Sequence, residues 1–262
     1  MNLKPRLPSF LPTPSEVGDF VRESEVWKSI FRPGSMFRKG YKDTSRDRAL
    51  ATMNNVLYHL HPVKIKRHGL KLTYTFCLGG LSFFLFVLLT VTGIFLMFFY
   101  RPMADPASAT AYADMQNIRT GVFFGDLVRN LHRWGAHLMV FSVTLHMARV
   151  FYTGAYKPPR EFNWVVGVIL LFLTLGLSFT GYLLPWDQLA IWAVTVGTSL
   201  AGYSPLIAKQ ANFLLLGGVV VGPETLLRWY VLHVLALPFV LVLFLAVHFW
   251  RIRKDGGISG PL

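Results

Sequence analysis

The sequence is poor in charged residues and almost free of cysteine. Of its 262 residues only 15% are charged, whereas 53% are hydrophobic. Soluble domains usually carry about 25% charged residues, so this composition favours a membrane protein. Cys77 is the one cysteine, which excludes an internal disulfide. The first 22 residues contain no apolar run, so we do not expect a cleaved signal peptide.

The net charge is +13, but the basic residues are unevenly distributed. They are concentrated in the first 71 positions and in the last dozen, and few lie in the apolar stretches between. Lys and Arg gathered at the edges of apolar segments are typical of a polytopic membrane protein. We therefore expect membrane lipid, and not nucleic acid, as a partner.

Composition divides the chain into two predicted parts. Residues 1–68 form a polar, basic N-terminal extension whose first part is rich in proline, which disfavours helix. Within it, residues 44–60 have the pattern of an amphipathic helix. That helix could lie on the membrane surface, where basic side chains meet anionic headgroups, or dock against a partner protein. Residues 69–262 form the predicted membrane domain.

Four apolar segments follow the extension. Each exceeds the ~20 helical residues needed to cross a hydrocarbon core of ~30 Å. Because lipid offers no hydrogen bonds to the backbone, we expect helices. The predicted spans are residues 72–100, 127–152, 162–184 and 229–250. A shorter apolar piece, residues 213–221, is interpreted as interfacial or re-entrant.

The basic residues also predict an orientation. The N-terminal extension, the connection containing Arg149 and Lys157, and the C-terminal tail are all basic. With an even number of spans these three segments lie on one side, which the positive-inside rule makes the cytoplasmic or n side. Both termini are therefore expected there, and the other two connections on the opposite, p side.

Four histidines in the predicted spans form a pattern. His132 and His146 are 14 residues apart in the second span, and His233 and His248 are 15 apart in the fourth. At ~100° and ~1.5 Å per residue, each helix carries its two histidines on one face, ~21–22 Å apart. Both helices run in the same direction. His132 and His233 are thus expected near the p side, and His146 and His248 near the n side.

Two facing helices with histidines at two depths are the geometry for two bis-histidine haems stacked across a bilayer. A single intramembrane histidine is more often a hydrogen-bonded packing residue, but two matched pairs are far less expected by chance. We therefore predict an all-α membrane protein, a four-transmembrane-helix haem-binding bundle. Its metal ligands are His132, His233, His146 and His248. His137 lies ~140° off this stripe and is predicted to be a packing or loop-bonding residue.

Glycines repeat the 14-residue spacing in the other two spans. They are Gly79 and Gly93 in the first span, and Gly167 and Gly181 in the third. Missing side chains would let a broad porphyrin approach the backbone, so we predict that these glycines contact the cofactor. Glycines in membrane helices also serve helix–helix packing, which is the alternative interpretation.

Arginines lie near all four histidines. Arg129 and Arg228 precede His132 and His233, and Arg149 and Arg253 follow His146 and His248. Guanidinium groups are natural bidentate partners of anionic haem propionates, so these arginines are predicted to bind the cofactor. For any one of them, anchoring a helix end at the membrane surface is an equally good interpretation.

Several strings closely resemble the N-terminal half of the cytochrome b family, and most of all the split cytochrome b6-type subunits of quinol:cytochrome c (plastocyanin) reductases. They include FCLGG at 76–80, LHRW at 131–134, TGYLLPWDQ at 180–188 and HFWRIRKDGGISGPL at 248–262. The resemblance covers about residues 69–262. The N-terminal extension, His137 and one extra glycine in the last string depart from the family pattern.

The resemblance implies two b haems on the four histidines and a role as the cytochrome b subunit of a multi-subunit oxidoreductase, inactive alone. It implies quinol oxidation near the p side, with Pro185, Trp186 and Asp187 as candidate catalytic residues. One electron would pass to a Rieske iron–sulfur protein and the other through both haems to an n-side quinone, coupled to proton translocation. Implied partners are a subunit carrying the C-terminal half of cytochrome b, a c-type cytochrome and a second copy. A bacterial inner membrane is the expected location.

Cys77 lies in FCLGG, where the resemblance implies a third, c-type haem held by a single thioether. The sequence contains no C-x-x-C-H motif, and a lone membrane cysteine would otherwise be interpreted as a packing residue. We place Cys77 about one turn into the first span, beside His146 and His248. The rival functions are a dihaem anchor of a dehydrogenase, which PWDQ and GISGPL disfavour, and a haem-free scaffold or transporter, which would lack a Soret band.

Overall fold

The structure is a computed structural model that describes residues 13–23, 27, 44–54, 67–104, 109–203, 208–218, 220–255 and 257–258. Within these residues all regular elements are helices. Contacts divide the chain into two units, Met1–Lys64 and Ile65–Leu262, and each is described by itself.

The first unit contains two described helices, α1 (Pro14–Glu23) and α3 (Ser45–Asn54). Thr13 caps α1, because its backbone N–H donates to Glu16 while its hydroxyl accepts from the N–H of Glu16. Thr44 similarly accepts from the backbone N–H of Asp47 at the start of α3. Of the predicted amphipathic helix 44–60, residues 55–60 lie outside the described residues.

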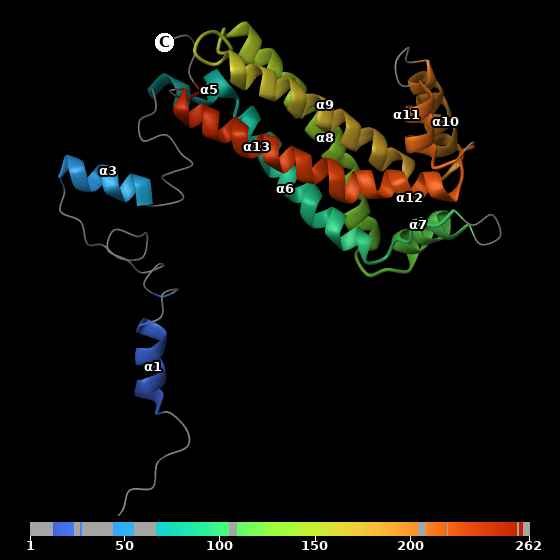
Figure 1. Cartoon of the computed structure of the whole chain (residues 1–262), viewed down its shortest axis with the longest axis horizontal. Coiled ribbons are helices and arrows are strands. Elements are labelled where there is room, and N and C mark those ends of the chain that lie inside the picture. The colour runs from blue at the N-terminus through green and yellow to red at the C-terminus, as the bar shows by residue number, and fades with distance from the viewer. Residues whose placement is uncertain are drawn as a thin grey trace, which may run out of the picture. The chain divides into compact units, whose positions relative to one another are not determined.

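The second unit is built around four long helical segments, which run alongside one another in Figure 1. α6 contacts α8, α8 contacts α9, and α9 contacts α13. The elements are η1 (Arg67–Leu70), α5 (Leu72–Thr75), α6 (Leu78–Met97), α7 (Thr110–Thr120), α8 (Gly125–Tyr152), α9 (Glu161–Leu183), α10 (Gln188–Gly202), α11 (Ala208–Leu216), α12 (Pro223–Val231), η2 (Leu232–Ala236) and α13 (Leu237–Lys254).

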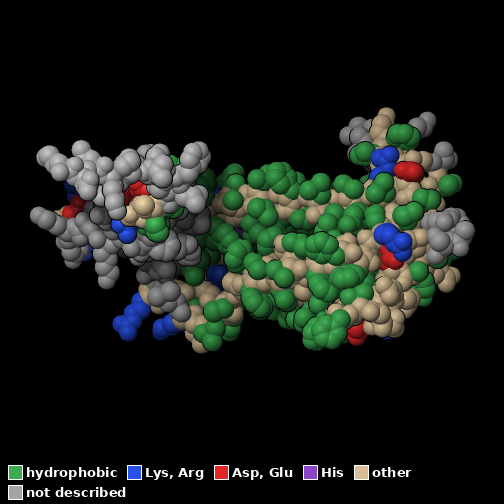
Figure 2. Space-filling model, turned by 90° about the horizontal axis from the view of Figure 1, so that it is seen from below, with side chains coloured by type: hydrophobic (Ala, Val, Ile, Leu, Met, Phe, Trp, Pro, Cys, Tyr) green, Lys and Arg blue, Asp and Glu red, His purple; other side chains and the backbone are tan. Residues whose placement is uncertain are grey.

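Three of these segments are long and apolar enough to cross a membrane: Leu78–Met97, Glu161–Leu183 and Pro223–Lys254. On the face shown in Figure 2, hydrophobic side chains cover the middle of the bundle, and the visible charged side chains lie toward its ends. α8 has 28 residues, which make a helix ~42 Å long. Its histidines and arginines lower its mean hydropathy, and it is not one of the three apolar segments. The prediction of four spans therefore depends on whether α8 also crosses the membrane.

The first predicted span is not one continuous helix. Phe76 and Cys77 have φ angles of 50° and 52°, in the left-handed region that interrupts a right-handed helix. They separate the short α5 from α6, and the backbone N–H of Cys77 donates to the hydroxyl of Thr75 at 3.2 Å. The expectation that Cys77 lies one turn inside the span is therefore wrong, because Cys77 immediately precedes the first residue of α6.

The last span contains a π turn, η2, which includes His233. Pro238 follows it and has no backbone N–H, so the regular bond to the carbonyl four residues earlier cannot form. A π turn accommodates one more residue than an α turn. It therefore absorbs the difference between the 15-residue spacing of His233 and His248 and the 14-residue spacing of His132 and His146.

The two ends of the bundle differ. We call the end with α7, α10, α11 and α12 the α7 end, and the end with α5 and the last turns of α13 the α5 end (Figure 1). At the α7 end the connections pack into two apolar clusters, one around Ile118 and Leu226 and the other around Leu183 and Val194. The piece predicted to be interfacial begins here as the end of α11, where Leu216 is buried.

Candidate functional site

The structure brings the four predicted ligands together in two pairs across the bundle. The rings of His132 and His233 have centroids 6.3 Å apart and planes inclined by 74°. For His146 and His248 the corresponding values are 6.5 Å and 80°. We call these the first and second histidine pairs. The first lies toward the α7 end and the second toward the α5 end.

These distances test whether one metal ion fits between each pair. A metal–imidazole bond is about 2.0 Å long and a ring nitrogen lies about 1.2 Å from the ring centre, so two axial imidazoles on one iron have centres about 6.3 Å apart. The observed distances of 6.3 and 6.5 Å agree with this spacing. Among the described residues no group of three or more His, Cys, Asp or Glu could hold a metal ion. The spacing of each pair thus fits the two histidine ligands of a bis-histidine haem.

Three of the four predicted glycines lie directly against these rings. A Cβ added at Gly79 or Gly93 would lie 3.2 Å from Cε1 of His146 or His132, respectively. At Gly181 it would lie 2.6 Å from Cε1 of His233, closer than real Cβ contacts allow. These positions therefore leave room for the imidazole rings themselves, which the sequence interpretation did not foresee.

Gly167 does not share this role. A Cβ there would have no atom within 4 Å apart from those of its own helical surroundings. No atom of His248, the histidine nearest in predicted depth, lies within 4 Å of a Cβ at this position, and the contact of Gly167 with the cofactor stays a prediction. The open space beside Gly167 remains compatible with a flat cofactor.

The first histidine pair is held by two threonines that the sequence interpretation missed. The hydroxyl oxygen of Thr92 on α6 lies 2.9 Å from Nδ1 of His132. The hydroxyl oxygen of Thr180 on α9 lies 3.0 Å from Nδ1 of His233. Each threonine directly precedes one of the predicted glycines, so a repeated Thr-Gly dipeptide was the available signal.

The second histidine pair has no such support. Nδ1 of His146 and Nδ1 of His248 are buried, and neither has a hydrogen-bond partner among the described residues. The residues that precede Gly79 and Gly167 are Leu78 and Val166, which carry no hydroxyl group.

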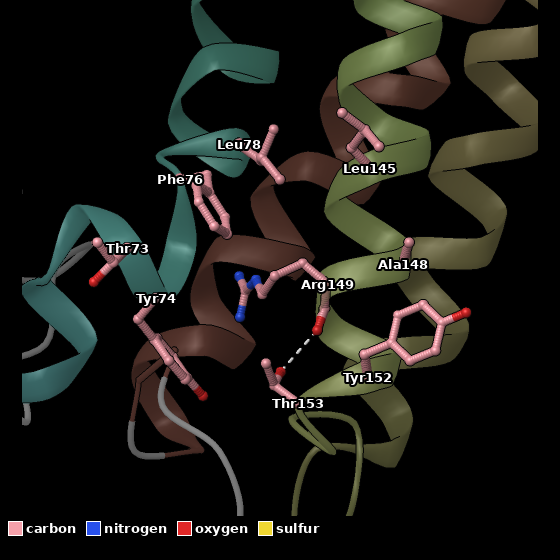
Figure 3. A pocket seen from close by; sticks show the side chains of 9 residues that line it. All are labelled: Thr73, Tyr74, Phe76, Leu78, Leu145, Ala148, Arg149, Tyr152 and Thr153. Carbon is pink, nitrogen blue, oxygen red and sulfur yellow. Dashed lines mark hydrogen bonds between the residues drawn. The ribbon is translucent and has the colours of Figure 1, made fainter.

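A cavity of about 620 Å³ lies at the α5 end, between the break after α5 and the last turns of α8. Phe76 and Leu78, the two neighbours of Cys77, line it together with Tyr74 and Arg149. Figure 3 shows the Arg149 side chain extending from α8 toward Tyr74 and Phe76. Its guanidinium carbon lies 5.7 Å from the Tyr74 ring centroid.

Arg149 is the predicted arginine best placed to meet an anion. Its Nε and Nη1 are buried without a hydrogen-bond partner among the described residues, which suits a carboxylate such as a haem propionate. Arg228 instead donates to the backbone carbonyl of Leu214 at 3.1 Å, which ties α12 to α11. Arg129 and Arg253 are partly buried on α8 and α13.

The candidate quinol-site residues lie at the α7 end, between α9 and α10. Trp186 has a φ of 51° and packs against both apolar clusters, and Pro185 before it is partly buried. Asp187 accepts a hydrogen bond from the backbone N–H of Ala190 at 2.8 Å, so it caps the first turn of α10. Their part in quinol oxidation stays a prediction.

Cys77 is exposed and is a free thiol. Both of its chain neighbours line the cavity at the α5 end, although Cys77 itself does not. The described structure thus leaves the thiol accessible beside a cavity that contains an unpaired guanidinium edge.

A membrane helical bundle with two facing histidine pairs is the arrangement of a dihaem electron-transport protein. The chain matches the family model Cytochrome b/b6/petB over residues 64–256, and it belongs to that family. It is therefore an integral membrane protein of a family that binds b haems.

Relatives and a solved structure support this assignment. The chain is 46% identical to cytochrome b6 of Heliobacterium modesticaldum over 202 residues, which are 77% of this chain and 91% of the relative. It is 46% identical to the menaquinol:cytochrome c reductase cytochrome b subunit of Bacillus subtilis over 190 residues, covering 72% and 83%. A chain of a hyperthermophilic respiratory Complex III matches with a TM-score of 0.66 and 29% identity. That match covers 84% of this chain and 55% of the other.

Proposed function

We propose that the chain is the cytochrome b subunit of a quinol:cytochrome c oxidoreductase, in which it carries electrons from a quinol to a quinone across the membrane. The two histidine pairs, each spaced for one iron, carry this proposal. Haem b bound between each pair would supply a one-electron redox centre. α8 would be the fourth membrane span, since it provides one histidine to each pair.

The surroundings of the two histidine pairs suggest which end of the bundle oxidises quinol and which end reduces quinone. Quinol oxidation is proposed at the α7 end, which would face the p side and which carries Pro185, Trp186 and Asp187. Quinone reduction is proposed at the α5 end, beside Arg149, with both termini on the basic n side. Proposed partners are a subunit with the C-terminal half of cytochrome b, a Rieske protein, a c-type cytochrome and a second copy of the chain. Release of protons at one end and uptake at the other would translocate protons.

The test is to remove one ligand from each pair in the intact complex. His132→Ala should abolish the b haem of the first pair, and His146→Ala that of the second, because an axial imidazole is hard to replace. Reduced-minus-oxidised spectra and haem extraction measure this. His137→Ala is the matched control, since His137 is exposed on the same helix. Two b haems retained in His132→Ala would contradict the assignment.

We also propose a third haem, attached to Cys77 through one thioether. The proposal is motivated by the resemblance of FCLGG to the attachment string of b6-type subunits, and the cavity lined by Phe76, Leu78 and Arg149 would offer space next to this cysteine. A covalent haem survives denaturing electrophoresis, so the polypeptide should stain for haem peroxidase activity and gain the mass of one haem. Cys77→Ser should remove both signals and keep the b haems. An unmodified mass for the native chain would refute this third haem alone.

A further inference from the structure

Thr92 and Thr180 occupy equivalent places on two different helices. Both are buried, with 6% and 2% of their surface exposed. Each approaches Nδ1 of one member of the first histidine pair, at 2.9 and 3.0 Å. Each is followed by a glycine that lies against the same ring, Gly93 against His132 and Gly181 against His233. The same Thr-Gly unit therefore meets both rings from opposite sides of the bundle.

We assign the direction of these hydrogen bonds from the partners of the hydroxyl protons. The Thr92 hydroxyl donates to the carbonyl of Leu88 at 2.7 Å, and the Thr180 hydroxyl to that of Leu177 at 3.1 Å. A hydroxyl has one proton, so its oxygen accepts from the imidazole Nδ1–H. This arrangement selects the tautomer with an unprotonated Nε2, which is the nitrogen that can bind a metal.

We propose that Thr92 and Thr180 are positioning residues that fix the rings of the first histidine pair and lower the reduction potential of the haem bound there. This inference deepens the proposed function. A hydrogen bond from Nδ1–H would make the imidazole donate more electron density to the iron through Nε2. This stabilises ferric iron over ferrous iron. The second pair lacks such bonds within the described structure, so the effect is confined to one of the two haems.

The experiment is a redox titration of both b haems in the purified intact complex. Thr92→Val and Thr180→Val keep the side-chain shape but remove the acceptor oxygen. We expect each to change the reduction equilibrium of the first-pair haem by up to about tenfold, which raises its potential by up to ~59 mV for one electron. Thr92→Ser and Thr180→Ser keep the acceptor and should restore the original potential.

Thr174→Val is the matched control. Thr174 is also buried on α9, but among the described residues its hydroxyl is hydrogen-bonded to nothing other than the carbonyl of Leu170, at 2.9 Å. This variant should leave both potentials unchanged. A shift of equal size in Thr174→Val, or in the second-pair haem of Thr92→Val, would show a general packing effect and overturn the inference.

The remaining outcomes are also decisive. Unchanged potentials in both valine variants, with both haems present, would overturn the inference and leave the haem assignment intact. If a valine variant loses the first-pair haem while its serine counterpart keeps it, the positioning role is supported. Loss of the first-pair haem from both the valine variant and its serine counterpart would mean that the hydroxyl group does not position the ring, and would overturn the inference. Absence of b haem from the unsubstituted complex would instead refute the proposed function.

Discussion

The two ends of the bundle surround similar histidine pairs with different environments. At the α7 end, the Nδ1 atoms of His132 and His233 are each hydrogen-bonded to a threonine hydroxyl oxygen, and four helices with two apolar clusters pack around that end. At the α5 end, the Nδ1 atoms of His146 and His248 have no hydrogen-bond partner among the described residues, and a cavity of about 620 Å³ lies beside the α5–α6 break.

The difference shows that two histidine pairs of nearly equal spacing can lie in different hydrogen-bonding surroundings. The first pair is over-determined by the protein, because hydrogen bonds and close glycines fix both rings. In the second pair Gly79 lies equally close to His146, but neither Nδ1 atom has a hydrogen-bond partner among the described residues, and the cavity with Arg149 lies at the same end.

Glycine substitutions give the largest expected effect on this comparison. Gly181→Ala places a Cβ 2.6 Å from the His233 ring, and overpacking of this kind costs ~1–3 kcal/mol. We expect loss of the first-pair haem. The Cβ added in Gly167→Ala meets no atom within 4 Å beyond its own helical surroundings, so this variant should keep both haems. Haem content per complex, from extracted pigment, measures both.

The sequence interpretation gives Gly167 and Gly181 the same role, whereas the structure places only Gly181 against a histidine ring. Comparing the two alanine variants therefore distinguishes the two interpretations. Equal haem loss in Gly181→Ala and Gly167→Ala would contradict the difference seen here. Loss in Gly167→Leu alone, with Gly167→Ala intact, would instead show that the space beside Gly167 belongs to the porphyrin.

Substitutions of Asp187 should have a smaller effect. They distinguish a structural role of this residue, as the cap of α10, from a role in quinol oxidation. Asp187→Ala removes the cap of α10 and should cost about 1 kcal/mol of stability, whereas Asp187→Asn keeps a good cap. If the carboxylate also takes part in quinol oxidation, Asp187→Asn should slow turnover by about 100-fold while thermal unfolding is unchanged. Normal turnover in Asp187→Asn would leave Asp187 as a helix cap only.

The sequence predicted the histidine pairs because helical periodicity is a local rule that four positions satisfy together. It did not predict the π turn at His233, whose signal was Pro238 and which brings the 15-residue spacing into line. The break at Phe76 and Cys77 had no glycine or proline to mark it, and left-handed bulky residues are rare. The threonine bonds depend on side-chain approach between helices, which spacing within one helix does not contain.

The smallest expected effect concerns an ion pair that docks α7. Asp114 accepts bonds from the backbone N–H of Arg101 at 2.9 Å and from its Nη2 at 2.7 Å. The Arg101 side-chain hydrogen bond lowers the pKa of Asp114 below its usual range. A lowered folded-state pKa stabilises the folded form above the unfolded-state pKa of ~3.9, and that stability is lost as pH falls through the folded value.

Because the Arg101 side chain is 68% exposed, solvent screens the pair and the effect should be modest. We expect hydrogen-exchange protection of α7 to fall as the pH drops below ~4 in the native protein. Asp114→Asn should have lower protection at neutral pH and lack this acid-dependent loss. Asp255→Asn, which alters the Arg251–Asp255 pair at the α5 end, should leave α7 unaffected. An identical pH profile in native protein and Asp114→Asn would mean that apolar packing around Ile118 alone docks α7 and that the ion pair contributes nothing to the rigidity of this end.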